Sequence, residues 1–282
     1  MSIERVDLGH GLGLRPKHFG RFLEGRPAVD WIEATSENFM TRGGRPLAVL
    51  EKVRRDMPVV LHGVSLSIGA VEPLDPRYLS QLCDLVRRIE PVLISDHLSW
   101  GKHGGRYAHD LWPLPYTEET LAHVVSRVGI VQERLGRQML LENVSSYVAY
   151  RESTMNEWEF LAQIAERADC GILLDVNNVY VSSQNHGFDP REYIAGLPPS
   201  RVLQIHLAGH TDKGTHLLDS HDAHVAPEVW DLYARTAELL GRVPTLIEWD
   251  DQIPELDVLV AESQKARSLE AKALERKKAV GS

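Results

Sequence analysis

Cysteine is scarce in this chain. Its two cysteines, Cys83 and Cys170, do not form a CxxC pair, and they are too few for a disulfide framework. Both lie in apolar surroundings, so we expect them to be core residues. The scarcity of cysteine predicts a cytoplasmic protein with reduced thiols.

Long apolar runs and an excess of positive charge are also missing. No segment approaches the ~18 apolar residues of a membrane span, and the start, MSIERVDLGHGLG, lacks the charged and then apolar pattern of a signal peptide. The formal net charge of −9 argues against a broad nucleic-acid surface, which needs a basic stripe. The 43% hydrophobic and 25% charged residues are typical of a globular protein. We therefore expect neither a membrane nor a nucleic acid as a partner.

Short apolar runs alternate with amphipathic helical stretches along almost the whole chain. The runs predict strands at Leu8–Leu14, Trp31–Ala34, Val59–His62, Val92–Asp96, Met139–Glu142, Ile172–Asp175, Val202–His206 and Thr245–Glu248. The stretches between them predict helices that include Pro76–Ile89, Glu118–Leu135, Glu157–Ala168 and Pro227–Leu240.

Eight strands that alternate with helices predict an α/β fold with a parallel sheet. That number favours closure into a single (β/α)8 TIM barrel. We expect the barrel to occupy residues 1–260. The Ala/Lys/Glu-rich residues 261–282 are predicted to form an exposed C-terminal helical tail that frays.

A His, Asp or Glu residue stands at the end of six successive predicted strands. In chain order these residues are His62, His97, Glu142, Asp175, His206 and Glu248. Because the strands of a barrel all run the same way, these side chains are expected at one rim, the C-terminal mouth. A single polar residue at a strand end is commonly a loop residue held by hydrogen bonds. Six in succession favour a metal site, because imidazole and carboxylate groups suit Zn, Fe and Mn, and bound cations would offset the repulsion between the carboxylates.

The segment QIHLAGHTDKGTHLLDSHDAH, residues 204–224, adds donors next to the seventh strand. In an extended Asp-x-His stretch, Asp219 and His221 would point to the same side. Asn178, one helical turn after the aspartate that ends the sixth strand, can supply a carbonyl oxygen. We expect His210 to hydrogen-bond a ligand. Nine donors exceed what one ion accepts, so two or three metal ions are implied.

Four further residues are expected near the mouth with less defined roles. Asn38 and Asn143 can orient ligands or a peptide, and a loop-capping role for them stays open. Arg15 is expected to reach the mouth. Asp250, in IEWD, is expected to support a ligand or contact the substrate.

The order of these donors resembles that of the xylose-isomerase-like barrels, including the trinuclear zinc apurinic endonucleases. Longer phrases resemble the multinuclear non-haem iron-dependent oxidases, once catalogued as domain of unknown function 692, whose best-known type is the methanobactin-biosynthesis oxidase. These phrases are GLGLRP, LHGVSLSIG, ISDHLSW, LLENVSSY, LLDVNNVYVSSQNHG, IHLAGH, DSH and IEWD. The resemblance runs from Gly9 to Asp251. The endonucleases have a histidine at the position of Asn178, whereas the oxidases have an asparagine there, as this chain does.

The resemblance implies an oxidase with two or three iron ions (Fe2+/Fe3+) that uses O2 as co-substrate. Its substrate would be a cysteine residue of a ribosomally synthesised precursor peptide. The substrate thiolate would bind ferric iron, and an iron–superoxo species would abstract a hydrogen atom from the cysteine Cβ. By motif, the iron ligands would be His62, His97, Glu142, Asp175, His206 and Glu248, with Asn178, Asp219 and His221 around the third ion. A partner protein that binds the leader peptide is also implied.

Three other functions remain open. One is a zinc phosphodiesterase resembling the apurinic endonucleases, which is disfavoured by the net charge, by Asn178 and by the absence of a basic run near the donors. Another is a sugar isomerase or epimerase with the same barrel, which needs a different ligand set. The third is a non-enzymatic metal-binding subunit, which a complete ligand set around an open mouth makes the least favoured.

Overall fold

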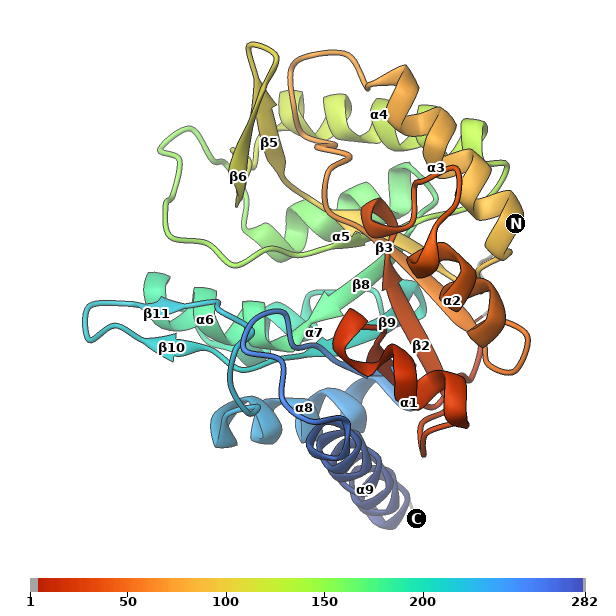
Figure 1. Ribbon diagram of the computed structural model, residues 1–282. Helices are drawn as coiled ribbons and strands as arrows, with labels where there is room; N and C mark the ends of the chain where they lie inside the picture. The colour runs from red at the N-terminus through yellow and green to blue at the C-terminus, as the bar shows by residue number, and fades with distance from the viewer. Residues whose placement is uncertain (1–4, 281–282) are drawn as a thin grey trace.

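Eight parallel strands close into a barrel in the computed structural model, which describes residues 5–280. The strands are β1 (His10–Gly13), β2 (Trp31–Thr35), β3 (Val59–Gly63), β4 (Ile94–His97), β7 (Leu140–Glu142), β8 (Gly171–Asp175), β9 (Val202–Leu207) and β12 (Thr245–Ile247). They lie in chain order around the barrel, and β1 closes it by pairing in parallel with both β12 and β2. Each overlaps one of the eight predicted strands, so the predicted TIM barrel is confirmed (Figure 1).

Helices surround the barrel in the connections between its strands. They are α1 (Phe19–Glu24), α2 (Arg45–Val53), α3 (Pro76–Ile89), α4 (Glu118–Leu135), α5 (Glu157–Arg167), α6 (Val176–His186), α7 (Pro190–Ala195), α8 (Pro227–Leu240) and α9 (Leu256–Val280), with short 3-10 turns at Pro16–His18, Ser36–Asn38 and Pro199–Arg201. Polar side chains begin several of them: Asp75 accepts from the backbone N–H of Arg77, and Asn156 forms a capping box with Glu159. Among the described residues, no helix has the length and apolar character needed to cross a membrane.

The C-terminal helix differs from the exposed tail expected from residue 261. Helix α9 already begins at Leu256, so the expected boundary falls inside one continuous helix. Leu259, Ala266 and Ala273 are buried, and the helix packs against α8 and against strands β1 and β12. The small alanine side chains that suggested a solvated tail instead allow a close approach between the helices.

The two cysteines also differ from each other. Cys170 is buried, and burial raises the pKa of its thiol to about 12, which keeps it protonated. Cys83, on α3, is only partly buried, with its Sγ 3.3 Å from the carbonyl oxygen of Arg134. The expectation of a core position therefore holds for Cys170 alone.

Two antiparallel hairpins extend from the loops at the C-terminal ends of the strands. One consists of β5 (Trp100–His103) and β6 (Arg106–Trp112), and the other of β10 (Thr211–Asp212) and β11 (Leu217–Leu218). Both project on the same side of the molecule, at the left in Figure 1. They form two walls beside the mouth of the barrel.

The barrel interior has an apolar layer below a polar layer. Trp31, Val60, Leu140, Leu173 and Leu246 belong to one buried apolar cluster. Two residues further along the chain from these stand Glu33, His62, Glu142, Asp175 and Glu248, all buried; the first four lie on their strands and Glu248 directly follows β12. Because residues i and i+2 of a strand point to the same side, the second set lies directly above the first. The sheet thus presents a ring of ionisable groups on an apolar floor.

Candidate metal centre

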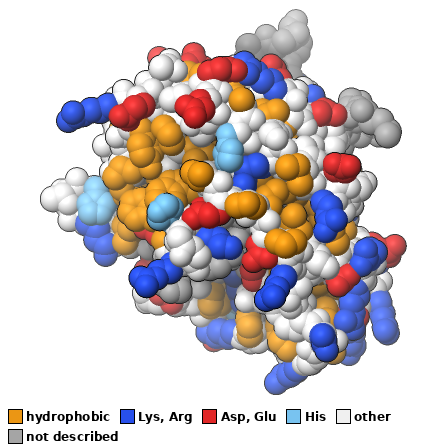
Figure 2. Space-filling model, turned by 90° about the horizontal axis from the view of Figure 1, so that it is seen from above, with side chains coloured by type: hydrophobic (Ala, Val, Ile, Leu, Met, Phe, Trp, Pro, Cys, Tyr) orange, Lys and Arg blue, Asp and Glu red, His pale blue; other side chains and the backbone are white. Residues whose placement is uncertain are grey.

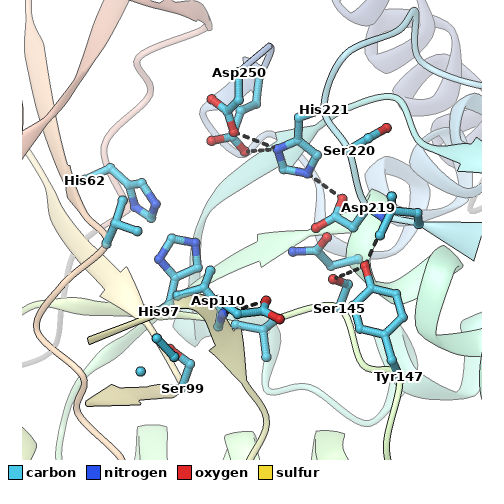
Figure 3. A pocket seen from close by; sticks show the side chains of 18 of the residues that line it. His62, His97, Ser99, Asp110, Ser145, Tyr147, Asp219, Ser220, His221 and Asp250 are labelled. Atoms are coloured by element: carbon cyan, nitrogen blue, oxygen red, sulfur yellow. Dashed lines mark hydrogen bonds and ion pairs between the residues drawn. The ribbon is translucent and has the colours of Figure 1, made fainter. Parts of the chain in front are cut away.

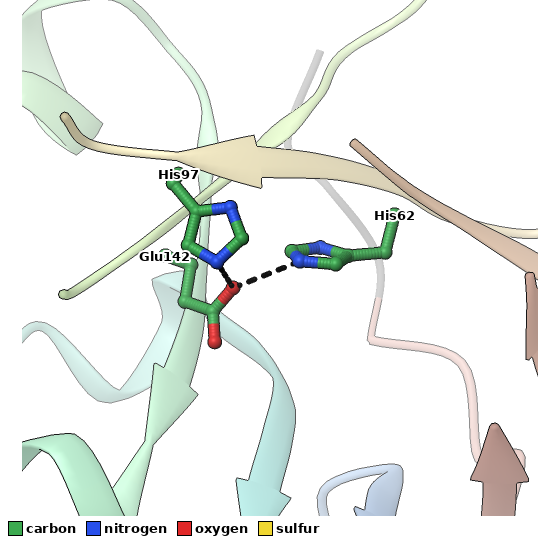
Figure 4. Close-up of side chains that lie close together, drawn as sticks. All are labelled: His62, His97 and Glu142. Carbon is green, nitrogen blue, oxygen red and sulfur yellow. Dashed lines mark ion pairs between the residues drawn. The ribbon is translucent and has the colours of Figure 1, made fainter. Parts of the chain in front are cut away.

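The first donor group consists of His62 on β3, His97 on β4 and Glu142 on β7. The Nε2 atoms of both histidines lie 3.2 Å from Oε2 of Glu142 (Figure 4). The Nδ1 atom of each ring has a hydrogen-bond partner on the side away from Glu142. For His62 it is Oγ of Ser95, at 2.8 Å, and for His97 it is the carbonyl oxygen of Gly63, at 3.1 Å. Partners on Nδ1 fix each ring with Nε2 facing the carboxylate, the usual arrangement of metal-binding histidines.

The members of the second donor group are all buried. They are Glu142, Asp175, His206 and Glu248, whose ligand atoms all lie within 4.8 Å of one another. Nδ1 of His206 is 3.0 Å from Oε2 of Glu248 and 3.3 Å from Oε1 of Glu142. Glu142 therefore belongs to both the first and the second group.

The third donor group lies at the cavity surface and contains His221, Glu248 and Asp250. Nδ1 of His221 is 3.1 Å from Oδ2 of Asp250 and 3.3 Å from Oε2 of Glu248, and its Nε2 is 2.6 Å from Oδ1 of Asp219 (Figure 3). Asp219 and His221 point to the same side, as expected, but the expected extended backbone is wrong, because His221 has a φ of 46° and the chain turns there.

The other predicted residues lie around these groups. Asn178 is buried next to Asp175, and its Nδ2 donates to the carbonyl oxygen of Asn143. Asn143 joins the ends of β7 and β8, because its side chain accepts from the N–H of Asp175 and donates to the carbonyl oxygen of that residue. Among the described residues, His210 makes no hydrogen bond to a predicted ligand: its Nδ1 is 2.8 Å from Oδ1 of Asn177, whose Nδ2 donates to Asp219.

Arg15 and Asn38 both line the mouth. Arg15 forms an ion pair with Asp250, so the guanidinium and the third donor group share this carboxylate. Asn38 stands at the end of the 3-10 turn after β2. Arg15 therefore lies at the mouth of the barrel, and its contribution to the site stays a prediction.

Two buried polar atoms beside these groups have neither a hydrogen bond nor an ion pair among the described residues. They are Oδ2 of Asp175 and Oδ1 of Asn178. Buried polar atoms without partners are costly, and metal coordination is one way to satisfy them. Imidazole nitrogens, carboxylates and an amide oxygen form a donor set that suits a borderline transition metal such as iron or zinc. The residues thus fit a centre of more than one metal ion.

The charges in the cluster strongly shift the pKa values of its members. Burial and the neighbouring imidazoles lower the pKa of His62 well below its usual value. For His206 and His221, burial also favours the neutral form, but the adjoining carboxylates outweigh it and raise the pKa of both well above the usual value. Burial raises the pKa of Asp175, whereas His206 and His221 outweigh burial at Glu248 and lower its pKa. Without metal, protons on histidine neutralise part of the carboxylate charge.

A cavity of about 1220 Å³ opens above the first and third groups. Its walls include Gly101, Ala108 and Leu111 from the first hairpin and Leu218 from the second. Figure 3 shows His62 and His97 on one side of this space and His221 on the other. In the view from above, hydrophobic side chains surround histidines on the left of the molecule, the side on which both hairpins project (Figure 2). The cavity is large enough for a segment of a peptide.

Glu33 and Gln204 contact the centre although neither was predicted as a site residue. Oε2 of Glu33 lies 3.1 Å from Nε2 of His206 and accepts a 2.6 Å hydrogen bond from Nε2 of Gln204. A signal for Glu33 exists in the sequence: Trp31-x-Glu33 repeats the apolar-x-acid pattern that places Glu142 and Glu248. The predicted second strand ends at Ala34, one residue beyond Glu33, so Glu33 does not stand at a strand end as the other donors do.

Comparisons with known proteins agree with this architecture. The sequence model of the family described as "RiPP precursor modification enzyme MbnB/TglH/ChrH" matches residues 9–271, where RiPP denotes a ribosomally synthesised and post-translationally modified peptide. A protein from Anaeromyxobacter sp. (strain Fw109-5), named only as a UPF0276 protein, is 68% identical over 274 residues and covers 97% of each chain.

Solved structures with the same fold are much more distant in sequence. An L-ribulose 3-epimerase has a TM-score of 0.62 at 15% identity and covers 99% of this chain and 97% of its own. Endonuclease IV from Thermus thermophilus has a TM-score of 0.59 at 16% identity and covers 94% of this chain and 99% of its own. These likenesses show the xylose-isomerase-like barrel and carry no statement about activity.

Proposed function

The chain belongs to the RiPP precursor modification enzyme family MbnB/TglH/ChrH, and from this membership we propose that it is a multinuclear non-haem iron-dependent oxidase that uses O2 to modify a cysteine residue of a ribosomally synthesised precursor peptide. The proposal accounts for both the peptide-sized cavity and the ring of metal donors. We also propose that a partner protein presents the leader part of the peptide. A cytoplasmic location stays a prediction.

The observation that carries the proposal is the sharing of carboxylates between the donor groups. Glu142 belongs to the first and second groups, and Glu248 belongs to the second and third. Carboxylates that serve two neighbouring ions are a recurrent feature of multinuclear non-haem centres. The first group, His62, His97 and Glu142, would hold one iron ion. The second group, Glu142, Asp175, His206 and Glu248, would hold another. The third group, His221, Glu248 and Asp250, would hold a third ion, with Asn178 and Asp219 nearby. When bound, the iron ions would supply a ligand site for the substrate thiolate and the electron transfer to O2.

The exposure of the donors indicates where the peptide would approach. The side chain of His97 is 12% exposed and that of His221 is 11% exposed, whereas those of Glu142 and His206 are 1% and 0% exposed. The first and third groups therefore face the cavity, and the second group lies below them. A cysteine side chain that enters between the hairpins would meet the outer groups first.

The protein would contribute orientation and exclusion of water to this chemistry. Ser95 and the carbonyl oxygen of Gly63 fix the imidazoles of His62 and His97. The hairpin residues Ala108 and Leu111 place apolar atoms beside the polar donors, which limits solvent around a bound peptide. Loss of these supports would disturb the reaction without removing a ligand.

The other two enzyme functions lack a comparable observation. The likeness to endonuclease IV and to an epimerase lies in the barrel, at 15–16% identity. Asn178 in place of a histidine also removes an imidazole donor from the mouth. We therefore propose the iron oxidase alone.

The proposal is tested by co-expressing the enzyme with short Cys-bearing peptides encoded next to its gene and measuring peptide mass. We expect a mass change in one peptide that needs O2, iron and the cysteine. A Cys→Ser version of the same peptide is the matched control and should stay unmodified. Unmodified cysteine in every such peptide with iron-loaded enzyme, or an equal change in the Cys→Ser control, would contradict the proposed function.

A further inference from the structure

Glu33 is a buried carboxylate on β2 for which the proposed reaction has no direct use. It is 5% exposed, and its strand is not adjacent to β9, because β1 and β12 lie between them in the barrel. Even so, its side chain crosses the interior to reach His206 and Gln204 on β9. A carboxylate buried this deeply is costly unless it is paired, so its partners indicate its role.

The two ring nitrogens of His206 face different surroundings. Nδ1 points to the second donor group, 3.0 Å from Oε2 of Glu248 and 3.3 Å from Oε1 of Glu142. Nε2 points the other way, 3.1 Å from Oε2 of Glu33 and 3.0 Å from Nε2 of Gln204, an amide nitrogen that donates to the same carboxylate oxygen. A neutral imidazole carries one proton, and the charged acceptor Glu33 outweighs the neutral amide and favours the tautomer with that proton on Nε2. Nδ1 then keeps its lone pair for a metal ion.

Gln204 holds Glu33 in this position. Residues 204 and 206 lie on the same face of β9, because they are two positions apart in one strand. Nε2 of Gln204 donates to Oε2 of Glu33 over 2.6 Å, and the side chains of Gln204 and His206 are both fully buried. Glu33 therefore accepts from two neighbours of one strand, which restricts the rotamer of its long side chain.

We propose that Glu33 is a positioning residue for the second metal group: it accepts the Nε2–H of His206, commits that histidine to bind metal through Nδ1, and adds a buried negative charge behind the ion. The inference rests on the proposed metal centre. The charge makes the imidazole a stronger donor and favours the more positive oxidation state of a bound ion. Glu33 itself contacts neither the substrate nor the cavity among the residues described.

Binding of Co2+ alone to the metal-free protein tests this inference without any peptide. Glu33→Gln keeps the size of the side chain but removes the charge. We expect one binding step to weaken about 10- to 100-fold, as is usual when a partner behind a metal-binding histidine is lost, while the other steps change less than about threefold. Glu157→Gln is the matched control: it neutralises a carboxyl on α5, outside the barrel, that accepts from Tyr193, and it should leave every step unchanged.

The outcomes separate the inference from the proposed function. If Glu33→Gln binds Co2+ as the wild type does, the positioning role is wrong and the metal centre still stands. If the wild type binds no Co2+, Zn2+ or Fe2+ at all, the metal centre fails, and the inference fails with it.

A second measurement on the wild type keeps the test informative if Glu33→Gln does not fold. Nitrogen-15 NMR of the Zn2+-loaded protein reports which ring nitrogen of each histidine carries the proton. We expect His206, assigned by the loss of its signals in His206→Gln, to carry the proton on Nε2 and to bind zinc through Nδ1. The reverse assignment would overturn the proposal.

Discussion

Glu142 and His206 connect two parts of the candidate centre: Oε1 of Glu142 lies 3.3 Å from Nδ1 of His206, while Oε2 of the same carboxylate lies 3.2 Å from Nε2 of His97. One side chain thus offers an oxygen to each of two donor groups. His97, in contrast, belongs to one group only. Because Glu142 belongs to two donor groups and His97 to one, replacing Glu142 is predicted to remove more metal than replacing His97.

Removing the shared carboxylate should cost more metal than removing the unshared histidine. Glu142→Ala is expected to lower the metal content by about two ions per chain, and His97→Ala by about one, because each ion needs several protein donors. Both variants should lose peptide oxidation and keep the barrel, as judged by metal analysis and circular dichroism. Equal metal loss in the two variants would argue against a shared carboxylate, and full activity with normal iron loading would contradict the ligand assignment.

Arg15 should limit metal binding at the third group. Its guanidinium forms an ion pair with Asp250, which also faces His221. In Arg15→Gln the carboxylate is released from its cation, and we expect metal affinity at this group to rise by roughly three- to tenfold, about 1 kcal/mol for a partly exposed pair. Titration with Zn2+ measures the change. An unchanged or weaker third binding step would show that Asp250 does not contribute to a metal site.

Metal affinity should increase as the pH rises from about 6 to about 8. Nearby carboxylates outweigh burial and raise the pKa values of His206 and His221 well above the usual histidine value of about 6.5. Without metal these histidines are therefore still protonated near neutral pH, and a metal ion must displace their protons. Calorimetry of Zn2+ binding in buffers of different ionisation enthalpy should detect proton release. Binding with no proton release at pH 7 would contradict the protonation states inferred for these histidines.

Glu157 should make the fold less stable at alkaline than at acidic pH. Burial, opposed by hydrogen bonds from Tyr193 and Tyr116, raises its pKa to about 7 from an ordinary value of 4.5. Because the pKa of Glu157 is higher in the folded than in the unfolded state, the protonated carboxyl stabilises the fold. This contribution to the free energy of unfolding is fully present below about pH 4.5 and is lost as the pH rises through about 7.

Glu157→Gln removes this ionisation. The Tm of the variant relative to that of the wild type should therefore rise by about 5–10 °C between pH 5 and pH 8, the shift that about 2.5 kcal/mol produces in a protein of this size class. Thermal unfolding of the metal-free proteins measures it. A pH-independent difference between the two proteins would mean that Glu157 keeps an ordinary pKa.

The barrel and most of its candidate ligands follow from local patterns in the sequence. Each strand is a short apolar run, and Glu142 and Glu248 end such runs at the points where a parallel barrel collects its strand ends. The order of the donors along the chain therefore indicates their grouping in space. The resemblance to a known family adds iron and the peptide substrate, which no residue pattern specifies by itself.

The features that were missed depend on contacts across the barrel or on local backbone geometry. The role of Glu33 depends on a side chain reaching His206 across the interior, and strand periodicity does not reveal such a pair. The close approach of Asp250 to His221 depends on a turn with a positive φ at His221, which the Asp-x-His spacing does not predict. The burial of α9 likewise depends on its packing against α8 and not on its own composition.

Elemental analysis with Mössbauer spectroscopy tests the central claim most directly. The protein would be expressed in iron-rich medium and purified without air. The account predicts two or three iron ions per chain, part ferrous and part ferric, held by the donor groups that share Glu142 and Glu248. Stoichiometric zinc with little iron, persisting after reconstitution with iron, would contradict it and would direct attention to hydrolysis of damaged DNA.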